Sequence, residues 1–92
     1  MKINSSETAI VGKWLLIDGK MTSDENEKRI DWLINNCLVK ISVDWSGWEK
    51  LYQDTDDNRY WELTYPYGEM QGRGPKSLNV ISHDQATEKY KF

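Results

Sequence analysis

The stretch that decides the fold is residues 54–75, DTDDNRYWELTYPYGEMQGRGP. Its first residues, 54–58, are polar turn-formers, and residues 59–65 then alternate large and polar side chains as a half-exposed strand does. Pro66 ends the predicted strand, and a glycine-rich loop up to Pro75 follows. Aromatic and charged side chains therefore gather on one short strand and its flanking segments, a surface more typical of recognition than of catalysis.

Two further strands and a helix are predicted on the N-terminal side of this stretch. Residues 38–45 alternate apolar and polar side chains, and residues 48–53 return after the turn signal Ser46-Gly47, so both are predicted to be strands of one meander. Residues 23–35 have apolar side chains at helical spacing, which predicts the main helix. The side chains in phase on its apolar face are Ile30, Leu33, Ile34 and Cys37.

The two ends of the chain complete the predicted elements. Residues 10–17 are apolar and precede a turn signal, so they are predicted to form a first strand. Thr22 and Glu25 have the spacing of a capping box at the start of the main helix. Residues 78–81 predict a last strand, and a second capping box opens a short C-terminal helix that ends near Tyr90.

Length and composition favour one folded domain. A chain of 92 residues holds a single core, so residues 1–92 are predicted to be one domain with about 7–90 ordered. The mean hydropathy of −0.78 would suit a disordered chain, but five tryptophans and five tyrosines argue against disorder. The order β-α-β-β-β-β-α predicts an α+β fold, with an antiparallel sheet of four to five strands packed on one main helix.

Net charge and the distribution of apolar residues limit the classes of partner that the sequence predicts. A net charge of −3 gives no basic stripe for nucleic acid, and mild acidity suits either a basic protein partner or simple solubility. The first ten residues lack the apolar core of a signal peptide, and no apolar run is long enough for a bilayer. We expect a cytoplasmic monomer without direct contact to nucleic acid or membrane.

The sequence predicts no catalytic, cofactor or metal site. Residues 54–58 resemble the start of a calcium loop, but Arg59 and Tyr65 stand where glycine and glutamate are needed, which favours a polar hairpin turn. Glu62 and Glu69 are candidates for the carboxylate pair of a small hydrolase, although nothing fixes their separation. Glu62 is more simply a partner for Arg59 or Lys50 on the sheet.

The remaining reactive side chains have structural interpretations. His83 is the only histidine and is predicted to lie exposed near the start of the C-terminal helix. Cys37 is the only cysteine, which excludes an intrachain disulfide, and its phase on the main helix predicts a buried thiol. Most tryptophans fall on predicted strands and are expected to be core or sheet-covering residues, whereas Trp32 lies off the apolar face of the helix beside Arg29. One or two aromatic residues are expected to anchor an interface.

Several segments also resemble the bacterial immunity protein 27 family over about residues 7–90. The most specific is the string RYWELTYP at 59–66, and Asn58 stands where the family commonly has glycine. Within the loop, Gln71 and Arg73 also depart from the family pattern. The other segments that carry the resemblance are VGKW at 11–14, RIDWL at 29–33, SGWEKLY at 46–52, and the loop residues Glu69, Met70, Gly72, Gly74 and Pro75.

The resemblance implies an antitoxin of bacterial polymorphic toxin systems, which binds and neutralises a cognate toxin domain. Because cytotoxic nucleases are usually basic, we expect a basic nuclease domain whose active site an acidic inhibitor occludes. The alternatives are a small-molecule or peptide-binding module and, less favoured, the small hydrolase. The residues predicted to contact the toxin lie in the acidic turn and the glycine loop: Asp54, Asp56, Asp57, Tyr65, Tyr67, Glu69 and Arg73.

Overall fold

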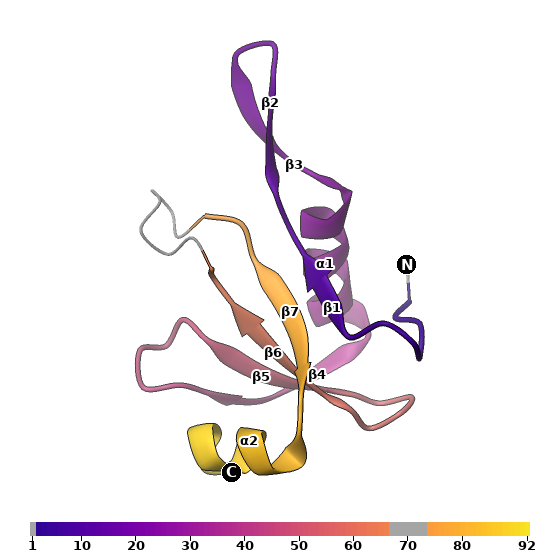
Figure 1. Ribbon diagram of the computed structural model, residues 1–92, viewed down its shortest axis with the longest axis vertical. Coiled ribbons are helices and arrows are strands. Elements are labelled where there is room, and N and C mark those ends of the chain that lie inside the picture. The colour runs from indigo at the N-terminus through magenta and orange to yellow at the C-terminus, as the bar shows by residue number, and fades with distance from the viewer. Residues whose placement is uncertain (1, 67–73) are drawn as a thin grey trace.

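The computed structural model describes residues 2–66 and 74–92, and within these ranges it confirms the predicted α+β fold. Five strands form an antiparallel sheet in the order β1-β7-β6-β5-β4, and β2 pairs with β3 in a separate two-stranded sheet (Figure 1). The elements in chain order are β1 (Ala9–Val11), β2 (Trp14–Ile17), β3 (Lys20–Ser23), α1 (Glu25–Asn36), β4 (Leu38–Val43), β5 (Lys50–Asp54), β6 (Tyr60–Thr64), β7 (Ser77–Ile81) and α2 (His83–Tyr90).

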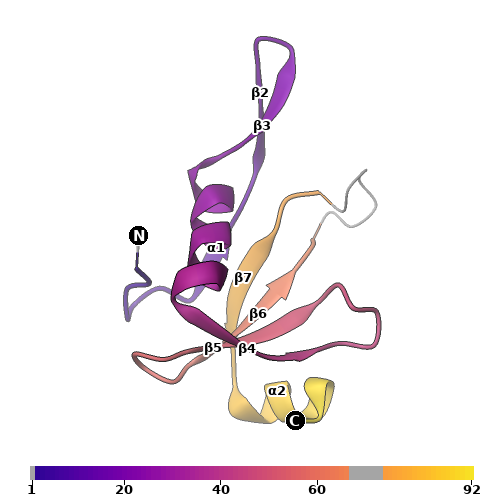
Figure 2. The same cartoon turned by 180° about the vertical axis from the view of Figure 1, so that it is seen from behind.

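The five-stranded sheet is covered on both faces, because its strands alternate their side chains between two apolar clusters. Trp61 and Leu63 on β6 belong to the cluster under α1, while Tyr60 of the same strand packs into the cluster with α2. Figures 1 and 2 show the two helices on different sides of the sheet. The second covering helix goes beyond the prediction, which placed one main helix on one face.

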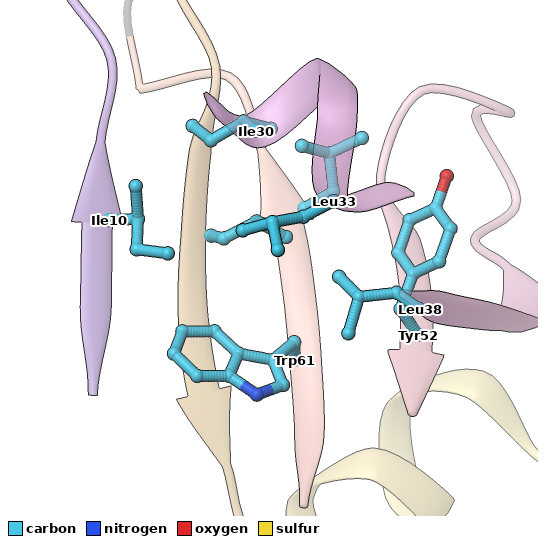
Figure 3. Close-up of a cluster of buried hydrophobic side chains, with 8 residues drawn as sticks. Ile10, Ile30, Leu33, Leu38, Tyr52 and Trp61 are labelled. Carbon is cyan, nitrogen blue, oxygen red and sulfur yellow. The ribbon is translucent and has the colours of Figure 1, made fainter. Parts of the chain in front are cut away.

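The larger cluster explains why the predicted helix forms and where it packs. Ile30 and Leu33 are fully buried against the strands, as Figure 3 shows, together with Ile10 from β1 and Trp61 from β6. Ile34 and Cys37 pack at the edge of the same cluster and are only partly buried. The apolar face predicted from helical spacing is therefore confirmed, with its centre at Ile30 and Leu33.

The helix begins at a different cap from the one predicted. Asp24 is the N-cap, and its Oδ1 accepts a hydrogen bond from the Glu27 backbone N–H at 2.8 Å. Thr22 lies in β3, so the capping box predicted from Thr22 and Glu25 is wrong. The cap predicted for α2 is confirmed, since Ser82 and Gln85 exchange side-chain to backbone hydrogen bonds.

Residues 10–17 do not form the single strand that their apolar character predicted. The chain changes sheets at Gly12 and Lys13: the Gly12 N–H donates to the Lys76 carbonyl at 2.8 Å, and the Lys13 carbonyl accepts from Asp24 N–H at 3.0 Å. β1 is thus an edge strand of the main sheet, whereas β2 turns back at Asp18-Gly19 and pairs with β3, a strand that the sequence did not predict. Figure 1 shows this hairpin extending away from the rest of the molecule.

The strands of the meander are shorter than predicted, and most tryptophans lie outside the core. β4 ends at Val43 after a register shift between Lys40 and Ser42, so Trp45 falls in the following turn. Only Trp61, among the five tryptophans, belongs to the buried residues, and its indole N–H has no partner among the described residues. The expectation that most of Trp14, Trp45, Trp48 and Trp61 are core or sheet-covering residues is therefore wrong, since Trp45 and Trp48 lie in the exposed connection between β4 and β5.

The N-terminal segment is held to the domain by two arginines. Arg29 of α1 makes two hydrogen bonds to the Glu7 carboxylate, at 2.7 and 2.6 Å, and Arg59 donates to the Glu7 carbonyl at 2.5 Å. The hydrogen bonds from Arg29 hold the pKa of Glu7 at about 2, against an ordinary value of 4.5. Residues 2–7 are therefore attached by charge-assisted contacts.

We predict that Leu33→Ala lowers the free energy of unfolding by about 2–5 kcal/mol, because it removes a fully buried side chain and leaves a cavity. Urea denaturation measures this loss. Val39→Ala removes an exposed side chain from β4 and should change stability by less than about 0.5 kcal/mol. Equal losses in the two variants would contradict the assignment of Leu33 to the core.

We also predict that Glu7→Gln destabilises the protein at neutral pH by about 1 kcal/mol, a modest value because the ion pair is partly solvent-exposed. The pKa of Glu7 is lowered on folding, so its contribution is complete above pH 5 and is lost as the pH falls towards 2. The difference between wild type and variant in unfolding free energy should shrink over that window. A difference independent of pH would contradict the Glu7–Arg29 pair.

Candidate functional site

The acidic turn predicted to contact a partner joins β5 to β6. The Asp54 N–H donates to the Arg59 carbonyl at 3.0 Å, and the Asn58 N–H donates to the Asp54 carbonyl at 2.8 Å. Asn58 has a φ of +63°, a backbone conformation that asparagine tolerates better than most residues. The segment is therefore the polar hairpin turn favoured from the sequence. Among the described residues, no three side chains of the metal-ligating types are grouped as a metal site requires.

The three aspartates of this turn have different roles. Asp54 is buried, and its Oδ1 accepts a hydrogen bond from the Asp56 N–H at 2.8 Å, so it organises the turn from inside. Asp57 pairs with Arg59 at 2.6 Å. Desolvation works against ionisation of Asp57, but the hydrogen bonds from Arg59 outweigh it and hold the pKa of Asp57 below its ordinary value. Asp56 and Asp57 are exposed and are the two aspartates of the turn that a partner can reach.

Aromatic side chains gather at the opposite end of β6. Tyr65, which follows β6, is half-buried and makes an edge-to-face contact with Trp48 at a ring-centroid distance of 5.7 Å. Trp48 and Trp45 belong to the connection between β4 and β5, and Trp45 is 97% exposed. Of the predicted contact residues, Tyr67, Glu69 and Arg73 lie outside the described residues. We refer to Trp45, Trp48 and Tyr65 as the aromatic group.

The turn that carries Trp45 is organised by one carboxylate. Asp44 Oδ1 accepts hydrogen bonds from the Ser46 hydroxyl at 2.7 Å, from the N–H groups of Ser46 and Gly47 at 3.1 and 3.0 Å, and from Glu49 N–H at 3.3 Å. Desolvation opposes these bonds only in part, and the pKa of Asp44 is held below its ordinary value. The exposed indole of Trp45 is thus presented on a turn with a defined conformation, a feature that the sequence analysis missed.

The reactive side chains Glu62, Cys37 and His83 have structural roles and do not form one site. Glu62 Oε2 accepts hydrogen bonds from Lys89 Nζ at 2.6 Å and from the Tyr90 hydroxyl at 2.8 Å, which fastens α2 to β6. The predicted partner of Glu62, Arg59 or Lys50, is therefore wrong. Cys37 caps α1 beside one apolar cluster, and His83 begins α2 and contacts Tyr60 on the other face. Cys37 and His83 therefore lie against different faces of the sheet.

A second surface that sequence reasoning missed is the hairpin of residues 14–23, which we call the hairpin arm. Leu16 is 70% exposed and Met21 55% exposed, and Leu15 and Ile17 are exposed as well. A hollow of about 260 Å³ is lined by Trp14, Met21, Thr22 and Ser23. The consecutive residues Leu15, Leu16 and Ile17 were the available signal, because three apolar residues in a row must place side chains on both faces of a strand.

Comparison with known proteins identifies a family for this chain. No helix within the described residues is long and apolar enough to cross a membrane. No curated protein and no solved structure matches the chain. A family model described as Immunity protein 27 matches residues 16–82, which include β3, α1 and the whole meander. The match covers well over half of the 92 residues, and the chain therefore belongs to the immunity protein 27 family.

Proposed function

We propose that this immunity protein neutralises its cognate toxin by binding the toxin domain through the two ends of β6 and occluding the active site. The observation that carries the proposal is the 97% exposed indole of Trp45 on a turn fixed by Asp44, in a chain whose family implies a toxin partner. An inhibitor of this kind requires an exposed, ordered contact surface and no catalytic turnover. The Trp45 turn and the turn of Asp56 and Asp57 are such surfaces.

Trp45 has the properties of an interface anchor. Tryptophan is enriched among residues whose truncation costs the most binding energy, especially where the side chain fills a dry pocket of the partner. The Asp44 hydrogen bonds fix the turn before binding, so little conformational entropy is lost in the complex. The matching toxin surface is an apolar pocket large enough for an indole. Tyr65, through its contact with Trp48, extends this surface to the end of β6.

The acidic turn at the other end of β6 supplies long-range attraction. Asp56 and Asp57 are exposed, and Arg59 offsets part of their charge through its pair with Asp57. Exposed charges of this kind change the association rate of a complex more than its dissociation rate. The toxin class that fits is a basic domain, such as a nuclease with a cationic substrate surface.

Trp45→Ala should weaken binding to the cognate toxin domain, the one encoded by the adjacent gene. We expect a loss of about 30-fold or more, mainly through faster dissociation. Surface plasmon resonance with the immobilised toxin domain measures both rate constants. Trp32→Ala is the matched control, because it removes an exposed tryptophan from α1. If Trp32→Ala weakens binding and Trp45→Ala does not, the interface lies on α1. If the wild-type chain neither binds nor inhibits that toxin, the proposed function itself is wrong.

The double change Asp56→Asn and Asp57→Asn should slow association by up to about tenfold at low ionic strength and reduce its dependence on salt. The double change Asp84→Asn and Glu88→Gln removes the same number of charges from the exposed side of α2 and is the matched control. Equal association rates for the two double variants would place the steering charges elsewhere.

A further inference from the structure

The pairing of β2 with β3 alone is not expected to make the hairpin arm stable. β2 and β3 pair only with each other within the described residues, and a single two-stranded hairpin is marginally stable in water. Its turn is tight, because Asp18 and Gly19 have φ values of +51° and +77°, so the pairing continues to the tip. Both faces carry exposed apolar side chains, such as Leu16 and Met21 on one face and Ile17 on the other. These features favour the pairing of a further strand with the arm.

Within the described residues, no strand pairs with the outer edge of β3, and the backbone groups that point outward from this edge can be assigned. Asp24 N–H bonds to Lys13 carbonyl, and antiparallel partners alternate between pairs that bond to each other and pairs that do not. It follows that Lys20 and Thr22 direct their backbone groups towards β2. Met21 and Ser23 therefore direct their N–H and C=O groups outward, towards any strand that joins β3.

We propose that the partner of this edge is a second copy of the chain, and that two β3 strands pair antiparallel about a two-fold axis at Thr22. In this register Met21 of each copy lies opposite Ser23 of the other, so that the outward groups form four backbone hydrogen bonds. Thr22 lies opposite Thr22, a pair typical of adjacent strands. The product is a four-stranded sheet in the order β2-β3-β3-β2, which is isologous and closed.

Charge complementarity selects this register and this edge. Lys20 of one copy lies opposite Asp24 of the other, and the two-fold axis repeats the pair, so two ion pairs flank the backbone bonds. Asp24 uses Oδ1 to cap α1, which leaves Oδ2 for the lysine. On the outer edge of β2, the outward groups belong to Trp14 and Leu16. The two-fold registers centred on residues 14, 15 and 16 place Lys13 opposite Leu15, Ile17 or Gly19. That edge offers no opposite-charge pair.

The same pairing covers apolar surface. Trp14, Leu16 and Met21 share one face of the arm, because Leu16 is paired with Met21 and Trp14 with Ser23. The two-fold axis brings this set beside its copy, with the two Met21 side chains diagonal to each other. The hollow of the arm is lined by Trp14, Met21, Thr22 and Ser23, and the last three are the β3 residues that the second strand would pair with. Figures 1 and 2 show the arm at the opposite end of the molecule from α2 and from the turn between β5 and β6.

The test is sedimentation equilibrium of the purified chain from low to high micromolar concentration. The weight-average mass should rise from the chain mass of 10.8 kDa towards twice that value. Lys20→Glu places two like-charge pairs across the axis and should weaken association by about tenfold or more. Lys40→Glu makes the same charge change at an exposed position of β4, and this variant should associate as wild type does.

A backbone variant tests the edge independently of charge. Ser23→Pro removes an N–H that points outward, so it should weaken association while the helix and sheet signals in circular dichroism stay as in wild type. Two results would overturn the proposal: a wild-type chain that sediments at 10.8 kDa throughout, or dimers that Lys20→Glu leaves unchanged. The first result is also the one expected if the arm serves the toxin alone. Neither outcome alters the toxin-binding proposal, which the rate measurements test.

Discussion

The arrangement of the whole molecule depends on the buried carboxylate of Glu27 in the first turn of α1. Its Oε2 accepts a hydrogen bond from the Lys76 N–H at 2.8 Å and its Oε1 from Lys76 Nζ at 2.7 Å. Lys76 also pairs with Asp31 at 3.1 Å. Burial works against the charge on Lys76, but the hydrogen bonds to both carboxylates outweigh it and raise the pKa of the lysine. A carboxylate that is 3% exposed is tolerable only with such partners.

This contact fixes three segments that are far apart in the sequence. Gly12 lies against it: its N–H bonds to the Lys76 carbonyl, and a Cβ at Gly12 would collide with the Glu27 carboxylate. The point at which the chain leaves β1 for the hairpin arm, the start of α1 and the start of β7 are therefore held together. Because β7 pairs with both β1 and β6, the same contact also positions β6 and the surfaces at its two ends.

The segments that carry the family resemblance describe this framework more than they describe the toxin interface. In the string RYWELTYP, Trp61 and Leu63 are core residues and Glu62 fastens α2. The glycine of VGKW is required by close packing against Glu27. Tyr65 is the member of the string that reaches the proposed contact surface. Partner specificity is therefore expected to reside in exposed residues such as Trp45 and Asp56, because the fold does not constrain the residue type at these positions.

The sequence predicted those elements in which local pattern and tertiary packing agree. α1 was predictable because its apolar spacing matches the buried positions Ile30 and Leu33, and β6 because its alternation matches the two faces of the sheet. The hairpin arm was not predicted, because an apolar strand is expected to be buried and the change of sheet at Gly12 depends on Lys76, more than sixty residues away. The exposure of Trp45 depends likewise on the early end of β4.

Ion pairs within the fold reduce the negative charge that is available to attract a partner. Fifteen acidic and twelve basic residues give a net charge of −3, but many of the carboxylates already have partners within the fold. Glu7 pairs with Arg29, Glu27 with Lys76, and Glu49 and Glu62 share Lys89.

Asp44 and Asp54 are occupied by turn hydrogen bonds in the same way. The negative charge left for steering is therefore local, and its largest effect on a toxin is on the rate of encounter. Tight inhibition also requires slow dissociation, which exposed charges supply poorly and a buried indole supplies well. In the proposed complex, Asp56 and Asp57 are therefore expected to govern the association rate, and Trp45 the dissociation rate.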